Sequence, residues 1–212
     1  PEALTFIDPE IVSTGVIIFK LFREEIDSLP EKSRKFVSEA IYTTIINDSD
    51  NFLNANVNED TYRVCAQLMK YDLKPGEITK KFLFTFSAAE MRFIGETLST
   101  IETYEDDQIL FMSSTLEMLR KNNLTSQATE KMTRWVKGIK KNKIVVYFQE
   151  IGVKEFRLSF RSEEIDVYEI AVYFGGGGHQ KASGCKINGT FEEVKKKVLA
   201  KIKEKLHRNK TV

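Results

Sequence analysis

Four consecutive glycines occupy positions 175–178 of a 212-residue chain that has only 11 glycines in all. Glycine loses more conformational entropy on folding than any other residue, so a run of glycines is costly. Such a run is expected where the backbone must closely approach a ligand or another part of the chain. Successive backbone amides can also form a concave site for an anion such as phosphate. His179 follows the run directly, and Lys181 lies two residues further on. The alternative is a flexible turn, but an amphipathic segment before the run and a strand pattern after it favour a tight, ordered loop.

Strand-like segments gather in the second half of the chain. Residues 109–112 and 144–148 are short apolar runs rich in β-forming residues. In residues 156–161 every second side chain is apolar, which places Arg157 and Arg161 together on the opposite face of the strand. Because such segments alternate with helical ones, the sequence predicts an α/β fold.

The gap between two of these segments contains a glycine. Residues 144–150 and 156–161 are therefore predicted to be neighbouring strands of one sheet, joined by a turn near Gly152. Residues 182–187 form a weaker strand candidate.

Helix starts are marked by Ser or Thr followed three residues later by Glu, the spacing of a capping box. This spacing occurs at Ser28 and Glu31, Ser87 and Glu90, Ser114 and Glu117, and Thr190 and Glu193. Asn58 is expected to cap a further helix that contains Cys65.

The segment Lys74-Pro75-Gly76 predicts a domain boundary, because Pro and Gly interrupt regular structure. We expect a first domain over residues 1–73, a linking helix within 74–86 and a second domain over 87–212.

The charge balance argues against a protein that binds duplex nucleic acid over its whole surface, since the net charge is only +1. A local excess of positive charge lies in residues 190–212, with eight Lys and Arg against three Glu; a solvated face of a terminal helix is the simplest interpretation.

Two cysteines fit a reducing compartment, and no apolar run reaches the roughly 18 residues of a membrane span. We therefore expect a cytoplasmic protein with no membrane association.

The glycine run belongs to a longer pattern that resembles a known domain. Leu158-Ser159-Phe160-Arg161-Ser162, Ile165-Asp166-Val167, the glycines with His179, and Ala182-Ser183-Gly184-Cys185 are together similar to the DHH-associated domain of DHH-family phosphoesterases. That group includes nano-RNA and pAp phosphatases and RecJ-like exonucleases. The resemblance implies a substrate-binding role for Arg161, Ser162, Gly176, Gly177, Gly178 and His179. The position of Arg161 on the polar face of its strand agrees, because a guanidinium there can bind phosphate through two hydrogen bonds.

Two phrases in the first half resemble the catalytic domain of the same family. They are Ile7-Asp8-Pro9-Glu10 with Ser13-Thr14-Gly15, and Tyr42-Thr43-Thr44-Ile45-Ile46-Asn47-Asp48-Ser49. By this resemblance Asp48 is a metal-binding, catalytic aspartate, whereas on composition alone it lies in a solvated polar turn. Asp50 stands where the family commonly has glycine.

The family's other metal motifs, including Asp-His-His, do not occur in these 212 residues, which contain only two histidines. The resemblance therefore implies the C-terminal part of a DHH catalytic domain, a linking helix and a complete, smaller α/β DHH-associated domain. We expect a truncated, proteolysed or incomplete form of an enzyme that uses two Mn²⁺ ions.

The expected function of the intact enzyme is hydrolysis of short nucleotides: nano-RNA, pAp, or the products of cyclic dinucleotides such as pApA. The chain alone is expected to bind substrate and to be inactive. The alternatives are an RNA- or nucleotide-binding module without catalysis, as in alanyl-tRNA synthetase C-terminal domains, and an inactive regulator with the same fold. The oligomeric state stays open, with a homodimer among the alternatives.

Overall fold

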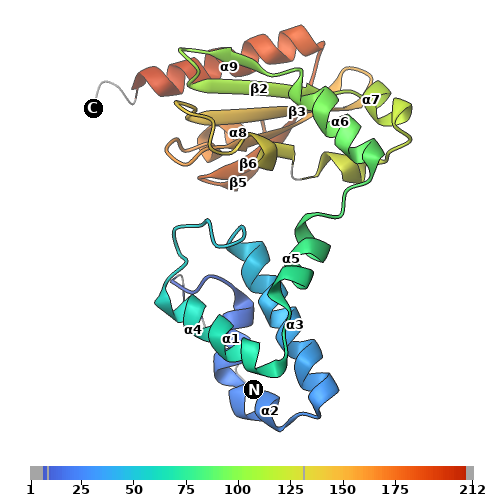
Figure 1. Cartoon of the computed structure of the whole chain (residues 1–212). Helices are drawn as coiled ribbons and strands as arrows, with labels where there is room; N and C mark the ends of the chain where they lie inside the picture. Colours follow the sequence, from blue (N-terminus) through green and yellow to red (C-terminus); the bar gives the residue numbers. More distant parts are fainter. Residues whose placement is uncertain (1–6, 9, 131, 209–212) are drawn as a thin grey trace, which may run out of the picture. The chain divides into compact units, whose positions relative to one another are not determined.

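The computed structural model describes residues 7, 8, 10–130 and 132–208, so Pro9 of the Asp-Pro-Glu phrase lies outside it. The chain divides into two compact units, Pro1–Thr85 and Phe86–Val212 (Figure 1). Helix α5 (Pro75–Leu83) occupies most of the segment that was expected to link two domains, and it packs on a helix of the first unit. None of the helices in the described ranges has the length and apolar character needed to cross a bilayer.

The described part of the first unit is helical. Its elements are α1 (Thr14–Leu21), α2 (Arg23–Ser28), α3 (Glu31–Asp48), α4 (Glu59–Leu68), the 3₁₀ helix η1 (Met69–Tyr71) and α5. Helix α3 contacts each of the other α-helices of this unit, and its Ile45 and Ile46 are fully buried. The unit is therefore organised around α3.

The two family-like phrases of the first half meet where α1 packs on α3. The hydroxyl oxygens of Ser13 and Thr44 lie 3.2 Å apart. A Cβ atom added to Gly15 would lie 2.0 Å from the Thr44 side-chain oxygen. Glycine is therefore required at position 15 because the two helices approach so closely.

The second unit contains a six-stranded sheet with the order β1-β2-β3-β4-β6-β5 (Figure 1). The strands are β1 (Glu102–Tyr104), β2 (Ile109–Ser114), β3 (Ile144–Gly152), β4 (Glu155–Arg161), β5 (Gly177–His179) and β6 (Ala182–Asn188). The helices are α6 (Ala88–Leu98), α7 (Leu116–Lys121), η2 (Ser126–Thr129), η3 (Met132–Val136), α8 (Tyr168–Tyr173) and α9 (Phe191–Arg208). Strands β2 and β3 are parallel, and the other neighbours are antiparallel.

The α/β fold class and the strand pair predicted from residues 144–161 are confirmed. The strand predicted over 182–187 is also present, as β6. Strands β1 and β5 were not predicted; each has three residues, and β5 lies inside the glycine run.

Each face of the sheet has its own core. On one face, Phe156, Leu158 and Phe160 of β4 pack with residues of α8 and α9. On the other face, residues of β2 and β3 pack with α6, α7 and η3, and this second core includes no residue of β4 or β6. The outward face of β4 and β6 thus lies beyond the second core.

Three of the five predicted helix caps are confirmed. Ser87 and Asn58 form reciprocal capping boxes, and Thr190 exchanges the same two hydrogen bonds with Glu193.

The other two predicted caps are wrong. Ser28 ends α2 and donates its hydroxyl to the Glu25 carbonyl, because Pro30 already stands before α3. Ser114 is the last residue of β2, and the helix that follows is capped one residue later, by Thr115.

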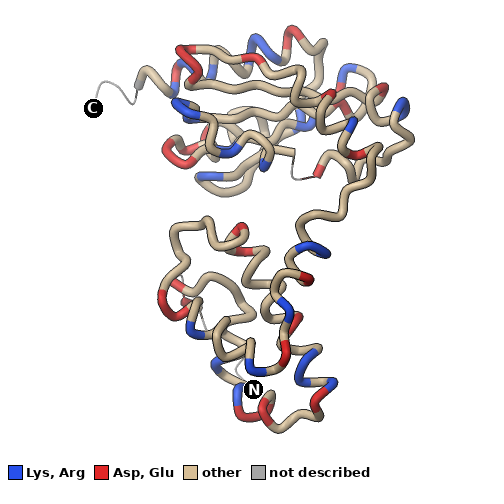
Figure 2. The backbone as a smooth tube through the Cα atoms, in the orientation of Figure 1, with Lys and Arg blue, Asp and Glu red and all other residues tan. Residues whose placement is uncertain are grey.

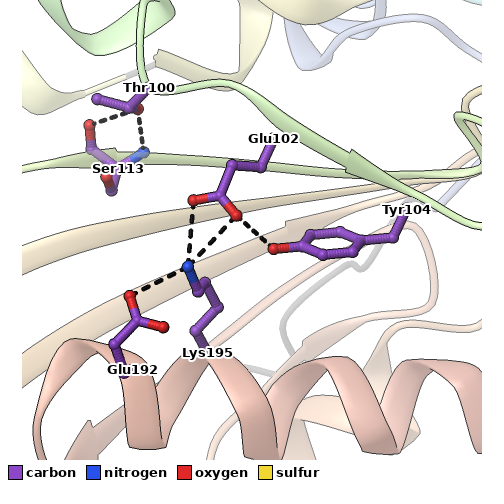
Figure 3. A network of polar contacts seen from close by, with 6 residues as sticks. All are labelled: Thr100, Glu102, Tyr104, Ser113, Glu192 and Lys195. Carbon is purple, nitrogen blue, oxygen red and sulfur yellow. Dashed lines mark hydrogen bonds and ion pairs between the residues drawn. The ribbon is translucent and has the colours of Figure 1, made fainter.

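A polar network joins α9 to the edge strand β1 (Figure 3). The Lys195 ammonium lies 3.2 Å from one carboxylate oxygen of Glu102 and 3.1 Å from Glu192 of its own helix. The Tyr104 hydroxyl donates to the other Glu102 oxygen. Burial and the Glu102 carboxylate raise the pKa of Tyr104 to about 12, while the hydrogen bonds from Tyr104 and Lys195 lower the pKa of Glu102.

We predict that Glu102→Gln lowers the free energy of unfolding by about 0.2–1 kcal/mol at pH 7, the usual range for an exposed ion pair. The folded-state pKa of Glu102 is depressed, so its contribution is present above the unfolded-state pKa and is lost as the pH falls through the folded-state value. Urea unfolding at pH 7 and pH 3 should therefore show a larger difference between wild type and variant at pH 7 than at pH 3. Glu192→Gln is the matched control: its side chain is 74% exposed against 45% for Glu102, so it should cost less. An equal cost for both variants would contradict the assignment.

We also predict that Gly15→Ala destabilises the first unit by about 1–3 kcal/mol, the range for overpacking a close contact. Gly76→Ala is the control, because Gly76 is likewise the second residue of a helix and a Cβ added there meets nothing within 4 Å. It should be neutral or slightly stabilising. Urea unfolding followed by circular dichroism distinguishes the two, and equal stability of both variants would refute the close-approach argument.

Candidate functional site

The outward face of β4 and β6 carries the polar side chains of the candidate site. In the β4–β6 register, Arg157 stands opposite Lys186, Ser159 opposite Gly184, and Arg161 opposite Ala182. Directly paired residues of an antiparallel sheet point to the same face. Arg157, Arg161 and Lys186 therefore share the face that the second core does not include.

A hollow of about 590 Å³ lies over this face. It is lined by the three outward residues of β4, by β6 from Ala182 to Lys186 and by all four glycines of the run. The structure thus brings Arg161, Gly176, Gly177 and Gly178 together at one hollow of the second unit.

Arg161 has the environment of an anion-binding residue. It is partly buried, and burial lowers the pKa of its guanidinium, which nevertheless stays charged at neutral pH. One guanidinium nitrogen donates to the Phe160 carbonyl at 2.8 Å. Across the described ranges, no carboxylate forms an ion pair with it. A desolvated charge without a counter-ion is costly, so an anionic ligand at this position would stabilise it.

Two glycines of the run are required by the fold itself. A Cβ atom at Gly176 would lie 2.1 Å from the Gly184 carbonyl oxygen, and one at Gly178, whose φ is +136°, would lie 2.6 Å from the Ser183 Cα. The backbone that the run approaches is therefore strand β6, and residues 177–179 form edge strand β5 instead of a loop.

Gly177 differs from these two. A Cβ atom there would meet nothing within 4 Å, although the residue lines the hollow. Packing within the chain does not explain glycine at this position, whereas a ligand lying against the backbone would.

His179 is an exposed residue near the end of β5, opposite Ala182, which in turn lies opposite Arg161. His179 and Arg161 therefore share one face of the sheet with β6 between them. Two strand spacings put their Cα atoms ~10 Å apart, a separation that long side chains and a phosphate-sized group can bridge. Lys181, in the turn after β5, pairs with Glu163 at 3.2 Å.

Ser162 is held by the chain itself. Its hydroxyl donates to the Lys143 carbonyl at 2.6 Å and accepts from the backbone amides of Glu164 and Ile165. The residue is 7% exposed. With these hydrogen bonds Ser162 orders the turn after Arg161, and its role in substrate binding stays a prediction.

Asp48 ends helix α3 and is exposed. One of its carboxylate oxygens accepts a hydrogen bond from the Asn47 amide at 2.8 Å. Among residues 7–8, 10–130 and 132–208, no three His, Cys, Asp or Glu side chains come together as a metal site. These residues alone therefore do not fit a site for two Mn²⁺ ions, which needs several converging ligands.

The backbone of the turn after Asp48 adopts a conformation that favours glycine. Asp50, Asn51 and Phe52 have φ values of +50°, +58° and +67°, in the left-handed region. Asp and Asn tolerate this region better than most residues, so Asp50 can occupy a position where the family commonly has glycine. Phe52 is less suited to it and stacks on Tyr62, with ring centroids 5.4 Å apart.

The lysine-rich helix α9 is not a free basic surface. Lys195, Lys201, Lys203 and Lys205 each form an ion pair with a glutamate of the same unit. Figure 2 shows basic and acidic positions interspersed along the chain.

Two residues that line the hollow, Lys186 and Ser159, were not predicted as site residues. The alternating pattern of β4 already predicted that Arg157 and Arg161 face the same way. Lys186 joins them only through the pairing of β4 with β6, which connects segments more than twenty residues apart in sequence.

Comparison with known proteins connects this geometry to a family. Residues 107–208 match the DHHA1 domain. A curated relative from Thermus thermophilus, a bifunctional oligoribonuclease and PAP phosphatase NrnA, is 26% identical over 97% of this chain and 60% of its own length. A relative of the same name from Bacillus subtilis is 24% identical over 87% of this chain and 58% of its own length.

A solved structure gives the same result for the fold. The exopolyphosphatase-related protein from Bacteroides fragilis superposes with a TM-score of 0.84 at 25% identity, covering 98% of this chain and 60% of that one. The chain thus spans about 60% of the length of its first relatives. These matches show that the second unit carries a DHHA1 domain, and over most of its length the chain is similar to members of the DHH family of phosphoesterases.

Proposed function

We propose that this chain supplies the substrate-binding part of a metal-dependent phosphoesterase that acts on short nucleotides. The observation that carries the proposal is the partly buried Arg161 guanidinium, which has no carboxylate partner in the described ranges and lines the same hollow as the glycine run. Support also comes from the relatives, whose names specify oligoribonucleotides and pAp as substrates.

In this proposal Arg161 binds a phosphate through its fork of N–H groups, and Gly177 lets the nucleotide lie against the backbone of β5. His179 donates a further hydrogen bond from the same face. Gly176 and Gly178 hold β5 against β6, and Ser162 positions the end of β4. Ordered donors of this kind recognise phosphate without contributing a reactive group.

Hydrolysis is proposed for the complete enzyme, with Mn²⁺ and Asp48 as part of its metal site, in the cytoplasm. The oligomeric state, a homodimer among the alternatives, stays a prediction. The metal ligands beyond Asp48 are not assigned to residues of this chain, so we assign no catalytic step to it.

A second candidate function is nucleotide or RNA binding without hydrolysis. It is favoured by a match to the A-adding tRNA nucleotidyltransferase from Aquifex aeolicus, 26% identical over 76% of this chain and 19% of that protein. That protein is named for adding nucleotides to tRNA. A segment similar to this chain therefore occurs in a protein with a different activity.

The first test concerns Arg161. We predict that Arg161→Ala weakens pAp binding by about 1.5–3 kcal/mol, the usual contribution of a hydrogen bond to a charged group, and that Arg161→Lys falls between wild type and Ala because the two-pronged contact is lost. Calorimetry measures the three affinities. Arg120→Ala, which removes an exposed arginine from α7, should bind as wild type. Unchanged affinity in Arg161→Ala would refute the assignment.

The second test separates the two roles of glycine in the run. Gly177→Ala should leave the melting temperature unchanged and weaken pAp binding, because the added methyl group occupies the hollow and not the protein interior. Gly176→Ala should lower the melting temperature, because its Cβ would collide with strand β6. Wild-type affinity in Gly177→Ala would show that the nucleotide does not approach this backbone.

The third test concerns hydrolysis. We predict that this chain with added Mn²⁺ shows no turnover of pAp, pApA or a short RNA, because the described residues do not gather a two-ion ligand set. Product release is followed by chromatography, with a full-length relative as the positive control. Turnover comparable to that control and abolished by Asp48→Ala would show that the catalytic centre is complete in this chain.

A further inference from the structure

The hollow has a second cationic position at the end far from Arg161. Arg157 and Lys186 stand directly opposite each other in the β4–β6 register, and both line the hollow. Both side chains are exposed. Like charges placed directly opposite on adjacent strands destabilise a sheet unless something neutralises them.

The chain itself neutralises this pair only weakly. Lys186 has one acidic neighbour, Glu155, at 3.9 Å, and the Glu155 side chain is 41% exposed. Arg157 forms no ion pair within the part of the chain that the structure describes. This contrasts with α9, where four lysines pair with glutamates at 3.2 Å or less.

The space between the two cationic positions is open. Ser159 and Gly184 lie opposite each other midway between Arg157 and Arg161. They present only a hydroxyl group and a bare backbone to the hollow, so no large side chain separates its two ends. Four residues along a strand place Arg157 ~13 Å from Arg161.

We propose that Arg157 and Lys186 form a second phosphate subsite, which binds a backbone phosphate of a single-stranded oligoribonucleotide whose terminal phosphate lies at Arg161. This inference rests on the proposed function and specifies its substrate class. A chain of several nucleotides can run along the Ser159–Gly184 floor and reach both positions, whereas pAp occupies only the end at Arg161. The subsite therefore favours short RNA over a mononucleotide.

The test uses the 212-residue chain and two ligands, pAp and a pentaribonucleotide with a 5′ phosphate. Calorimetry measures pAp binding, and fluorescence anisotropy measures binding of the labelled pentanucleotide at several salt concentrations. The variants are Arg157→Ala/Lys186→Ala and, as a control for lost positive charge, Lys196→Ala/Lys197→Ala. The control residues are exposed positions of α9, which packs on the opposite face of the sheet. Melting temperatures verify that both variants fold.

We expect Arg157→Ala/Lys186→Ala to weaken pentanucleotide binding about five- to tenfold and to reduce the slope of log affinity against log salt by about 0.7, the value for one phosphate contact to a single strand. Binding of pAp should change less than twofold, and the control should match wild type for both ligands. Equal pentanucleotide affinity in wild type and variant, with pAp still bound, would overturn the subsite and leave the proposed function standing. An equal loss in the control would likewise overturn it, as a general charge effect. Failure of wild type to bind either ligand would overturn both proposals.

Discussion

The pairing of β4 with β6 is the interaction on which the candidate site depends. It connects two segments that are distant in sequence and sets Arg157, Ser159 and Arg161 opposite Lys186, Gly184 and Ala182. A shift of one residue in this register would turn the β6 side chains to the other face. The register is held by the hydrophobic core on the opposite face, where Leu158 and Phe160 are fully buried.

The glycine run combines two requirements in four residues. Gly176 and Gly178 allow β5 to pack against β6 at distances that no side chain would permit, whereas Gly177 leaves open space toward the hollow. The first requirement builds the site, and the second makes its backbone accessible. The residues that order the edge strand are therefore adjacent to the one that faces the hollow.

Local patterns in the sequence predicted what depends on neighbouring residues. The two-residue period of β4 correctly placed its apolar side chains in a core, and three of the five helix caps follow from residues three positions apart. The Ser28 and Ser114 caps failed because a proline and a strand end, respectively, decide where those helices begin. Strand β5 was missed because glycine has low strand propensity, and only its partner β6 makes it a strand. The role of Lys186 depends on a non-local pairing that no short pattern encodes.

We propose that the nucleotide phosphate binds between Arg161 and the glycine strand β5. A titration of ¹⁵N-labelled protein with pAp, followed through the amide resonances, tests this binding position. We expect the Gly177, Gly178 and His179 amides and the Arg161 side-chain resonance to shift together along one binding curve, while amides of α9 stay unchanged. Shifts confined to α9 or to the first unit, with the glycine amides unmoved, would contradict it.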